Sequence, residues 1–592
     1  MPRPDMPERT LTPKPSTDPT TEWGGDRPRR APYTGAAKRI GPERLAAYHD
    51  FTRRRTVNWP LYTVVRLLFV PFFLLYFRLS RQGRSYARHQ GGLIVAANHR
   101  SFLDPFVIAA ILPFRRPMAF VAKVELFEKR WQGWFLNRLG AYPVNRGEAD
   151  EDTVATTQAV LQRGGTICIF PEGTRIRSGS LAPPHRGVGR LALETGAAVL
   201  PVAVLGTEHI RRGWRIRPKK VKVRAGKAMT FPQTEHPSPQ LAATVTTRIW
   251  PNVELQWEWL GGLPPMRKAA VIGAGSYGTA VAVLLARAGL DVQLGCRTAE
   301  ATAELAEARE NTRYLPGVEL GEGITVRRAA DIEVAGLDLV CLAVPSAALP
   351  AAVAQIADRV GERTAVLLLS KGLVPPIGTL PSVYIGDRVR ARALATLGGP
   401  AHAKEAALGT AALVLASSDA DLRAQLGDAF DRSGLVCERT ADVVGVEMAG
   451  VAKNAAALAA AAAEGHGLNA AGIAAAEIWR ECIEFSELSG ADPETFAGLA
   501  GVGDLMATVM APGSRNRRAG ELLGNGMPAA QIPAELGQAS EALDSVPILA
   551  ATVSEAGVDA VGLEGLAALI EGEIDTTEWV NGLRRAESSR AA

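Results

Sequence analysis

The chain has 592 residues, 47% of them hydrophobic and 21% charged, which is too long for one hydrophobic core and predicts two or three globular domains. The formal charge of +5 hides a split: residues 1–265 hold 40 Lys and Arg against 20 Asp and Glu, whereas residues 266–592 hold 26 against 41. The basic half favours an anionic membrane surface as partner, and nucleic acid is not expected, because no zinc-finger, helix-turn-helix or RNA-binding motif accompanies the charge. The five cysteines lie far apart without metal-ligand spacing, so they indicate reduced thiols in a cytoplasmic protein and no metal site.

The first residues, 1–45, are rich in Pro, Arg, Thr and Gly and predict a disordered basic tail without a secretory signal. The apolar run 61–79 follows, and Arg66 and Pro71 make it short and interrupted for a membrane-spanning helix. It predicts an amphipathic helix in the membrane interface, and a buried first helix of the domain is the alternative. We therefore expect a cytoplasmic protein that associates peripherally with the inner face of the cell membrane.

Alternating short apolar runs and helical patterns predict three structured domains. Residues 46–250 predict an α/β domain, and residues 251–266 turn to Trp, Gly and Pro and predict a linker. Residues 267–440 alternate strands and helices after a glycine-rich loop, which predicts a Rossmann-like dinucleotide-binding domain. Residues 441–585 are rich in Ala, Leu and Glu with few strand signals, which predicts a mainly α-helical domain. Met266 resembles the start of a once-separate protein and indicates a gene fusion.

His99 and Asp104 stand five positions apart, directly after the predicted strand 93–97. Acyl transfer to a hydroxyl needs a base that takes a proton near pH 7, and a neutral imidazole suits this task. A carboxylate on the other ring nitrogen would fix the tautomer, provided that a helix begins at Pro105. Taken alone, the pair would more often be a surface His beside a helix-capping Asp.

A second block, FPEGTR at residues 170–175, follows another strand, and its Gly and Arg form a turn suited to a phosphate. Together the two blocks resemble the lysophosphatidic acid (glycerolipid) acyltransferase family, as do two weaker elements, GAYPVNR at 140–146 and VLPVA at 199–203. The resemblance covers about residues 60–235. It implies that His99 and Asp104 are catalytic and that acyl-CoA or acyl-carrier protein is the acyl donor. The residues that it assigns to the glycerol phosphate are Arg146, Glu172, Gly173 and Arg175.

The loop Gly273–Gly278 (GAGSYG) lies between a predicted strand, 269–272, and a predicted helix, 279–287. In this context a glycine-rich turn binds a pyrophosphate at the helix N-terminus. The next strand ends at Arg297, where an acidic residue is typical of NAD enzymes. Arg297 favours a 2′-phosphate and therefore NADPH; the alternative is an exposed Arg in an enzyme that accepts both NAD and NADP.

The rest of this half resembles NAD(P)-dependent glycerol-3-phosphate dehydrogenase. The resemblance spans nearly all of residues 266–570, with blocks such as NTRYLPG at 311–317, VVGVEMAGVAKN at 443–454 and GLAGVGDL at 498–505. It implies that Lys453 is the catalytic acid/base for the carbonyl oxygen of dihydroxyacetone phosphate, with a second ammonium, Lys371, holding its pKa down. The residues assigned to the substrate are Lys371, Gly399, Asp504, Ser514, Arg515 and Asn516. The residues assigned to the cofactor are Gly273, Gly275, Ser276, Tyr277, Gly278, Arg297, Lys371, Ala403, Arg515, Ala539 and Glu541.

The sequence departs from this family in three places: Ala401-His402 replace Ser-Phe, Glu477 replaces an Arg, and Ala542 replaces a Gly. His402 could supply a donor near the substrate or only pack. These departures motivate one alternative, in which the dehydrogenase half is a non-catalytic nucleotide- or phosphate-sensing module. The favoured hypothesis is a bifunctional enzyme of glycerophospholipid biosynthesis. It reduces dihydroxyacetone phosphate to sn-glycerol 3-phosphate and acylates glycerol 3-phosphate or its 1-acyl form. Both a monomer and a homodimer are compatible with the sequence.

Overall fold

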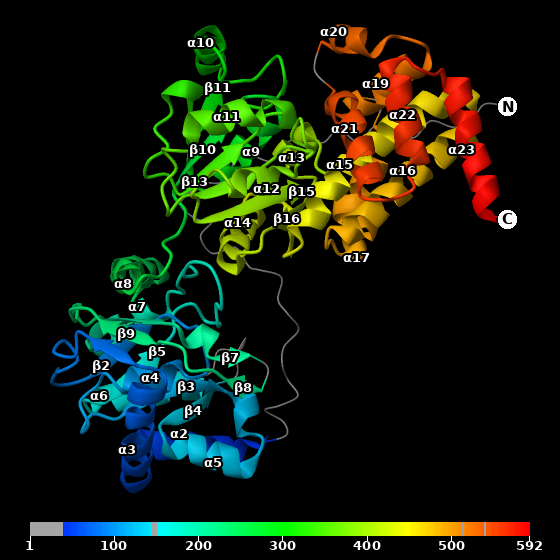
Figure 1. Cartoon of the computed structure of the whole chain (residues 1–592). Helices are drawn as coiled ribbons and strands as arrows, with labels where there is room; N and C mark the ends of the chain where they lie inside the picture. Colours follow the sequence, from blue (N-terminus) through cyan, green and yellow to red (C-terminus); the bar gives the residue numbers. More distant parts are fainter. Residues whose placement is uncertain (1–39, 145–150, 213, 512, 538–539, 592) are drawn as a thin grey trace, which may run out of the picture. The chain divides into compact units, whose positions relative to one another are not determined.

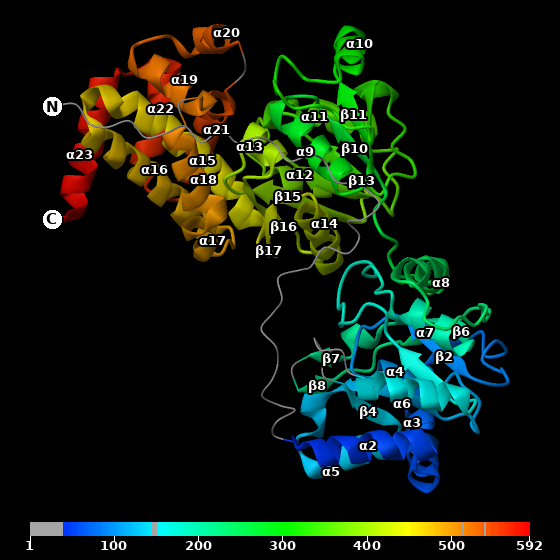
Figure 2. The same cartoon turned by 180° about the vertical axis from the view of Figure 1, so that it is seen from behind.

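The computed structural model describes residues 40–144, 151–212, 214–511, 513–537 and 540–591 (Figures 1 and 2). The chain divides into two compact units, Met1–Arg175 with Pro183–Gly261, and Ile176–Ala182 with Gly262–Ala592. Residues 1–39 of the predicted tail lie outside the described residues. The prediction is wrong for the end of that tail, because helix α2 (Pro42–Arg55) already begins at Pro42 and Ile40 is buried in the core of the first unit.

The first unit is built on a seven-stranded sheet with the order β1-β9-β6-β2-β5-β3-β4. All neighbouring strands are parallel except β6 and β9. The central strand β2 is buried along its whole length, as expected for a parallel sheet that helices cover. Because β2 and β5 are parallel neighbours, the loops that follow them meet at one edge of the sheet. The strands are β1 (Ser80–Gln82), β2 (Leu93–Ala97), β3 (Met118–Lys123), β4 (Ala141–Val144), β5 (Thr166–Ile169), β6 (Ala198–Leu205) and β9 (Lys222–Ala225).

The last helix of this unit corrects the predicted linker. Helix α8 (Pro239–Trp259) continues through Pro251, so the first nine positions of the range 251–266 are helical. Val253 and Trp257, one turn apart, are both buried and anchor the end of this helix. The other helices of the unit, besides α2 and α3, are α4 (Asp104–Ala109), α5 (Arg130–Arg138), α6 (Glu151–Gln162) and α7 (Gly187–Thr195).

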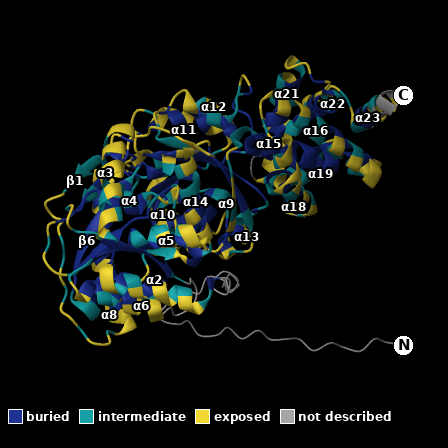
Figure 3. Cartoon of the chain, turned by 90° about the horizontal axis from the view of Figure 1, so that it is seen from below, coloured by how far each residue is buried: buried dark blue, intermediate teal, exposed yellow. Residues whose placement is uncertain are grey.

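Helix α3 (Trp59–Tyr76) is continuous through Pro71, and the Asn58 side chain caps its first turn by accepting a hydrogen bond from the Leu61 N–H. Only 11% of its residues are buried, so the alternative of a buried first helix is wrong (Figure 3). Within the described residues, α3 and the segment Val443–His466 are the two continuous helices long and apolar enough to cross a membrane, and the second is 83% buried.

The second unit begins with a Rossmann-like sheet of eight strands in the order β12-β11-β10-β13-β14-β15-β16-β17, parallel except between β15 and β16. The strand order reverses between β10 and β13, which is where such sheets bind dinucleotides. The strands are β10 (Lys268–Ile272), β11 (Asp291–Cys296), β12 (Ile324–Arg328), β13 (Leu339–Leu342), β14 (Ala365–Leu368), β15 (Ala393–Gly398), β16 (Ala412–Ala416) and β17 (Val436–Thr440). The helices among them are α9 (Ser276–Arg287), α10 (Ala299–Ala308), α11 (Leu349–Ile356), α12 (Pro381–Gly386), α13 (Ala403–Leu408) and α14 (Ala420–Arg432).

A helical domain follows the last strand. Its axis is α15 (Val443–Ala463), whose alanines let neighbouring helices approach closely and which is buried on nearly all sides. The remaining helices are α16 (Leu468–Leu488), α17 (Pro493–Ala497), α18 (Asp504–Met510), α19 (Arg515–Gly524), α20 (Ile532–Leu536), α21 (Glu541–Glu555), α22 (Val561–Glu571) and α23 (Thr576–Ala591). The predicted fold class, an α/β domain followed by a Rossmann-like domain and a mainly helical domain, is confirmed.

Candidate active sites

Asp104 organises the first site. It is fully buried at the start of α4, and its Oδ2 lies 2.9 Å from His99 Nδ1 and accepts the backbone N–H groups of Arg100 and Ser101 at 2.6 and 2.7 Å. Its Oδ1 accepts a hydrogen bond from the Thr207 hydroxyl at 2.6 Å. With Nδ1 as the donor to Asp104, Nε2 is the ring nitrogen of His99 that is left to take a proton from a substrate.

The loop after β5 supports this pair. The Phe170 ring stacks on the His99 ring with centroids 4.0 Å apart, and Glu172 Oε2 accepts the His99 backbone N–H at 2.8 Å. Gly173 has a φ of +69°, and a Cβ there would lie 2.9 Å from the ring of His185, so glycine is required. The exposed Arg175 points its Nε at His99 Nε2 over 3.4 Å. The structure thus brings Glu172, Gly173 and Arg175 to the dyad, and Arg146 lies outside the described residues.

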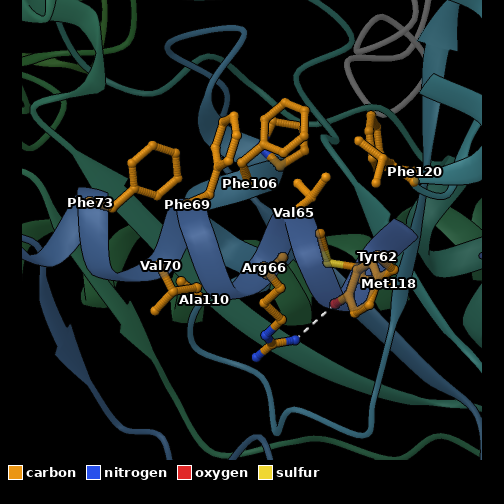
Figure 4. Close-up of a pocket in the computed structure, with 13 residues that line it drawn as sticks. Tyr62, Val65, Arg66, Phe69, Val70, Phe73, Phe106, Ala110, Met118 and Phe120 are labelled. Carbon is orange, nitrogen blue, oxygen red and sulfur yellow. Dashed lines mark hydrogen bonds between the residues drawn. The ribbon is translucent and has the colours of Figure 1, made fainter. Parts of the chain in front are cut away.

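An apolar groove adjoins the dyad. It is a narrow groove between α3 and α4 with a cavity volume of about 40 Å³, and Pro105, the residue after the catalytic candidate Asp104, forms part of its wall. Figure 4 shows side chains of α3 facing those of α4 and β3 across this groove. The one charged side chain in its lining is Arg66, whose guanidinium donates to the Tyr62 hydroxyl at 2.8 Å. The rest of the lining is mostly apolar and includes Val65, Phe69, Phe73, Phe106, Ala110, Met118 and Phe120.

The glycine-rich loop of the second unit is shaped for a dinucleotide. Gly273 has a φ of +109°, and a Cβ on Gly278 would lie 2.1 Å from the Gly273 carbonyl oxygen, so helix α9 can pack on β10 only without side chains here. A Cβ on Gly275, the residue before Ser276 and α9, would meet no atom within 4 Å, which leaves the helix N-terminus open. The Tyr277 hydroxyl is buried and has no hydrogen-bond partner in the described part of the chain. The open cradle and the unpaired hydroxyl both fit a bound NAD(P).

Three charged side chains meet where the Rossmann-like and helical domains join. Asp504, at the start of α18, places Oδ2 2.7 Å from Lys371 Nζ and Oδ1 3.5 Å from Lys453 Nζ. Lys453 also donates a hydrogen bond to the Thr508 hydroxyl at 3.1 Å. Lys371, Lys453 and helix α18, which carries both Asp504 and Thr508, are far apart in the sequence, yet these side chains form one largely buried cluster.

Electrostatics set this cluster up for proton transfer. Burial, the largest effect, and the neighbouring Lys371 ammonium lower the pKa of Lys453 from 10.5 to about 8, although Asp504 opposes them. Burial also opposes the charge of Asp504, but Lys371 and Lys453 outweigh it and hold the pKa of this carboxyl below its usual value. For Lys371, burial is outweighed by the Asp504 carboxylate, which raises its pKa. Lys371 therefore stays charged, while Lys453 can change protonation state near neutral pH.

A chain of side-chain amides surrounds the cluster. Asn454 donates to the Lys371 carbonyl at 2.9 Å and accepts from Asn516 at 2.7 Å, and Asn516 in turn accepts from the Ser540 hydroxyl at 3.0 Å. Ser514 caps α19 through its hydroxyl, and the following Arg515 is exposed and has no hydrogen bond or ion pair with any described residue.

The remaining predicted residues are spread over both domains of the second unit. Glu541, the first residue of α21, accepts the Ser346 backbone N–H at 2.9 Å and so joins the two domains. Gly399, with a φ of +95°, follows β15, and Ala403 begins α13. Arg297 is exposed just after β11, and Ala539 lies outside the described residues.

Known proteins match both halves. Residues 78–205 match the Acyltransferase family model, and residues 268–423 and 442–581 match the N-terminal and C-terminal models of NAD-dependent glycerol-3-phosphate dehydrogenase. A glycerol-3-phosphate dehydrogenase [NAD(P)+] of Deinococcus radiodurans is 38% identical over 326 residues, which cover 54% of this chain and 95% of that protein. The one from Mesorhizobium japonicum is 33% identical over 53% of this chain and 91% of that protein.

Residues 268–581 belong to the NAD(P)-dependent glycerol-3-phosphate dehydrogenase family. A crystal structure of the glycerol-3-phosphate dehydrogenase from Coxiella burnetii matches with a TM-score of 0.50 and 27% identity, covering 54% of this chain and 98% of that one. The predicted fusion of an acyltransferase domain to this dehydrogenase is confirmed, and so is the family's use of NAD or NADP. The matches favour a bifunctional dehydrogenase and acyltransferase over a sensing module.

The departures from the dehydrogenase pattern leave its lysines and carboxylate in place. His402 Nε2 lies 3.2 Å from the Ala507 carbonyl oxygen, so this side chain ties the loop after β15 to the helix that carries Asp504. Glu477 is buried and pairs with Arg480 at 2.9 Å, away from the Lys453 cluster. Neither substitution interrupts the contacts among Lys371, Lys453 and Asp504.

Sequence reasoning missed two residues that complete these sites. Thr508 stands four positions after Asp504, and that helical spacing on α18 could have placed both on the face towards Lys453. Thr207, which donates to Asp104, follows the end of β6 and carries no local signal that links it to the dyad.

Proposed function

We propose that the second unit reduces dihydroxyacetone phosphate to sn-glycerol 3-phosphate and that the first unit acylates glycerol 3-phosphate or 1-acyl-glycerol 3-phosphate. The observation that carries this proposal is that one chain holds an intact Lys371–Asp504–Lys453 cluster and an intact His99–Asp104 pair. Shared use of a glycerol phosphate gives the fusion its chemical logic.

In the reduction, bound NAD(P)H supplies the hydride to carbon 2 of the ketone. Lys453 protonates the carbonyl oxygen as it gains negative charge, and the permanently charged Lys371 stabilises that charge. Asp504 contacts both ammonium groups and keeps them in position. Its carboxylate also accepts a hydrogen bond from a substrate hydroxyl. Asn516 on α19, which donates to Asn454 next to Lys453, and the preceding Arg515 supply donors for the substrate phosphate.

In the acyl transfer, His99 Nε2 takes the proton from the acceptor hydroxyl as its oxygen attacks the thioester carbonyl. The carbon–oxygen bond forms, the carbon–sulfur bond breaks, and the imidazolium returns its proton to the leaving thiolate. Asp104 stabilises the imidazolium without taking its proton. Arg175, which lies beside Nε2, supplies the positive charge for the acceptor phosphate.

The apolar groove beside Asp104 supports an acyl chain as the transferred group. Pro105, which follows Asp104 in the sequence, and Phe106 line this groove, so a thioester held at His99 would extend its chain along α3. Widely exposed apolar side chains on α3 support peripheral binding of this unit to the inner face of the cell membrane, where such chains partition. Assembly as a homodimer is a further proposal, which the mass of the protein in solution would test.

A coupled assay tests the two activities together. Dihydroxyacetone phosphate, NADPH and an acyl donor are supplied, and mass spectrometry identifies the lipid product by its mass. A monoacyl product identifies glycerol 3-phosphate as acceptor, whereas a diacyl product that requires added 1-acyl-glycerol 3-phosphate identifies the monoacyl form. If the wild-type protein never oxidises NADPH with dihydroxyacetone phosphate, the sensing-module alternative replaces the reductase.

NADPH is the cofactor we favour, because Arg297 follows β11 directly, at the position where NAD enzymes typically carry an acidic residue for the ribose. Arg297→Ala should then lower kcat/KM for NADPH by about tenfold or more and leave that for NADH nearly unchanged. An equal effect on both cofactors would contradict this preference.

A further inference from the structure

A basic hairpin projects from the first unit between β6 and β9. Strands β7 (Arg211–Arg212) and β8 (Arg215–Ile216) pair antiparallel and lead into the segment 217–220. Six of the ten residues 211–220 are Arg or Lys and none is acidic. Trp214 is 82% exposed at the turn, and the neighbouring Ile216 is exposed as well.

Four of the positive charges of this hairpin have no ion-pair partner in the described part of the chain. Arg215, Arg217, Lys219 and Lys220 are all exposed, and none forms an ion pair with any residue that the structure describes. The acidic residue nearest in sequence is Glu208; its side chain is only 6% exposed and accepts the Gly206 N–H at 2.9 Å. Arg215 lies over the ring of the exposed Trp214 at 5.2 Å, and the other three cations follow within six residues. A Trp next to several cations without ion-pair partners matches an anionic lipid interface.

The hairpin is rooted on two functional elements. The Tyr76 hydroxyl at the end of α3 donates to the Ile216 carbonyl at 3.0 Å, which places β8 beside the end of that helix. Thr207, which donates to the catalytic candidate Asp104, stands four positions before Arg211. A ligand of the hairpin would therefore hold the end of α3 and the edge of the acyl-transfer site at the same surface.

The exposed face of α3 continues this surface. Val64, Leu68, Phe72 and Leu75 recur at helical spacing and are all exposed, and Leu75 directly precedes Tyr76. The apolar stripe of α3 ends next to a Trp and a group of cations. This succession matches the layers of a bilayer, in which apolar acyl chains are followed by an interface and then by charged headgroups. An acidic protein would satisfy the cations but would leave the stripe and Trp214 exposed to water.

We propose that residues 214–220 of this hairpin bind the anionic headgroups of a phospholipid bilayer, with Trp214 inserted at the interface, and that they give the α3 surface its selectivity for anionic membranes. This inference rests on the proposed membrane location of the acyltransferase. It assigns the apolar contribution to α3 and the charge recognition to the hairpin.

Vesicle sedimentation of the full chain tests the assignment. The variant Arg215→Glu/Lys219→Glu is compared with wild type on vesicles of neutral phosphatidylcholine and on vesicles with one third phosphatidylglycerol. Each basic residue near an anionic surface is worth about a fivefold change in binding. The variant should therefore lose at least about twentyfold in affinity for the anionic vesicles and change less than twofold on the neutral ones.

The matched control is Lys227→Glu/Arg248→Glu, which changes the net charge equally at exposed positions outside both the hairpin and α3. Its affinity for both vesicles should stay within about twofold of wild type, provided that the hairpin and not net charge is responsible. Equal losses in the two variants would overturn the proposal. So would a hairpin variant that binds anionic vesicles as wild type does.

Tryptophan fluorescence provides a second measurement. Brominated lipids in anionic vesicles should quench the wild-type emission, and Trp214→Ala should remove most of that quenching although nine other tryptophans remain. Unchanged quenching would place Trp214 outside the bilayer and contradict insertion. The corresponding control, Trp259→Ala, removes another exposed Trp and should leave the quenching in place.

Enzyme assays separate this inference from the proposed function. The hairpin variant should keep wild-type acyl transfer to a short-chain acceptor in detergent and lose it on anionic vesicles, with reductase activity unchanged. If wild type transfers no acyl chain in detergent, the proposed function fails, and the vesicle measurements still decide the role of the hairpin. If the variant binds vesicles normally but loses activity with acyl-carrier protein alone, the hairpin docks an acidic protein and the membrane proposal is wrong.

Discussion

The two sites use a buried aspartate in opposite ways. In the acyl-transfer site, Asp104 receives four hydrogen bonds, and one of them comes from the base itself, so the carboxylate controls the orientation of His99. In the dehydrogenase site, Asp504 lies between two ammonium groups and controls their charges. In the first site, Asp104 determines which ring nitrogen of His99 takes the proton. In the second site, Asp504 affects the pKa values of the two lysines.

The two sites also differ in how far their parts are separated along the chain. His99 and Asp104 are five residues apart in one strand–helix turn, whereas Lys371, Lys453 and Asp504 come from a loop after β14, from α15 and from α18. Substitutions in the first site should therefore act locally on one activity. Substitutions in the second should act on the charges of the whole cluster.

The largest effect that separates the sites is expected for His99→Ala. Loss of the general base should lower acyl transfer by about 10³–10⁴-fold, because no other described side chain hydrogen-bonds to Asp104 as an imidazole does. The reductase rate should remain within about twofold of wild type. Product formation from a labelled acyl donor and NADPH oxidation, measured on the same preparation, check both; equal loss of the two activities would contradict independent sites.

The reciprocal substitution is Lys453→Ala, with an expected loss of about 10²–10³-fold in the reduction of dihydroxyacetone phosphate. The second ammonium, Lys371, remains and keeps part of the electrostatic stabilisation of the oxygen, which makes this loss smaller than that in His99→Ala. Acyl transfer should be unaffected. A Lys453→Ala protein that reduces the ketone at the wild-type rate would assign the proton donor elsewhere.

The pH dependence gives a smaller but more specific difference between the sites. Burial, first, and Lys371 lower the pKa of Lys453 to about 8, and the protonated amine is the form that donates in the reduction. The rate of ketone reduction should be level below about pH 7 and fall about tenfold per pH unit above about 8. The reverse reaction needs the neutral amine, so its rate should rise through the same range. Steady-state rates in both directions between pH 6 and 10 measure this, and a reduction rate still level at pH 9.5 would contradict the lowered pKa.

More of the first site than of the second could be predicted from the residues themselves, because the parts of the first site are close together along the chain. A strand that turns into a helix at Pro105 brings His99 to Asp104 whatever the rest of the fold does, so spacing alone made the contact testable. The meeting of Lys371 with Lys453 depends on how the helical domain packs on the Rossmann-like domain, which no local pattern encodes. There only the resemblance to the dehydrogenase family proposed the residues.

Local patterns were misleading where packing overrode composition. Pro71 was predicted to interrupt an apolar run and Pro251 to begin a linker, yet α3 and α8 run through both. The alternation of strands and helices, in contrast, gave the order of the three domains correctly, because it reflects burial on two faces of a sheet. Glu172 was assigned to the substrate from its motif, whereas its visible contact is to the His99 backbone, and its contact with substrate stays a prediction.

The smallest expected effect comes from Thr508, and it tests how the dehydrogenase cluster sets the proton affinity of its acid. The Thr508 hydroxyl accepts a hydrogen bond from Lys453 and donates one to the Asp504 carbonyl, so its lone pair stabilises the charged form of the amine. Thr508→Val keeps the shape but removes this acceptor, which is worth about a threefold to tenfold change. The midpoint of the reduction profile should therefore move below pH 8, with a modest loss of kcat, and Thr508→Ser should restore both. A lower kcat with an unmoved midpoint would show that Thr508 only packs, and that burial, Asp504 and Lys371 set the pKa of the amine without it.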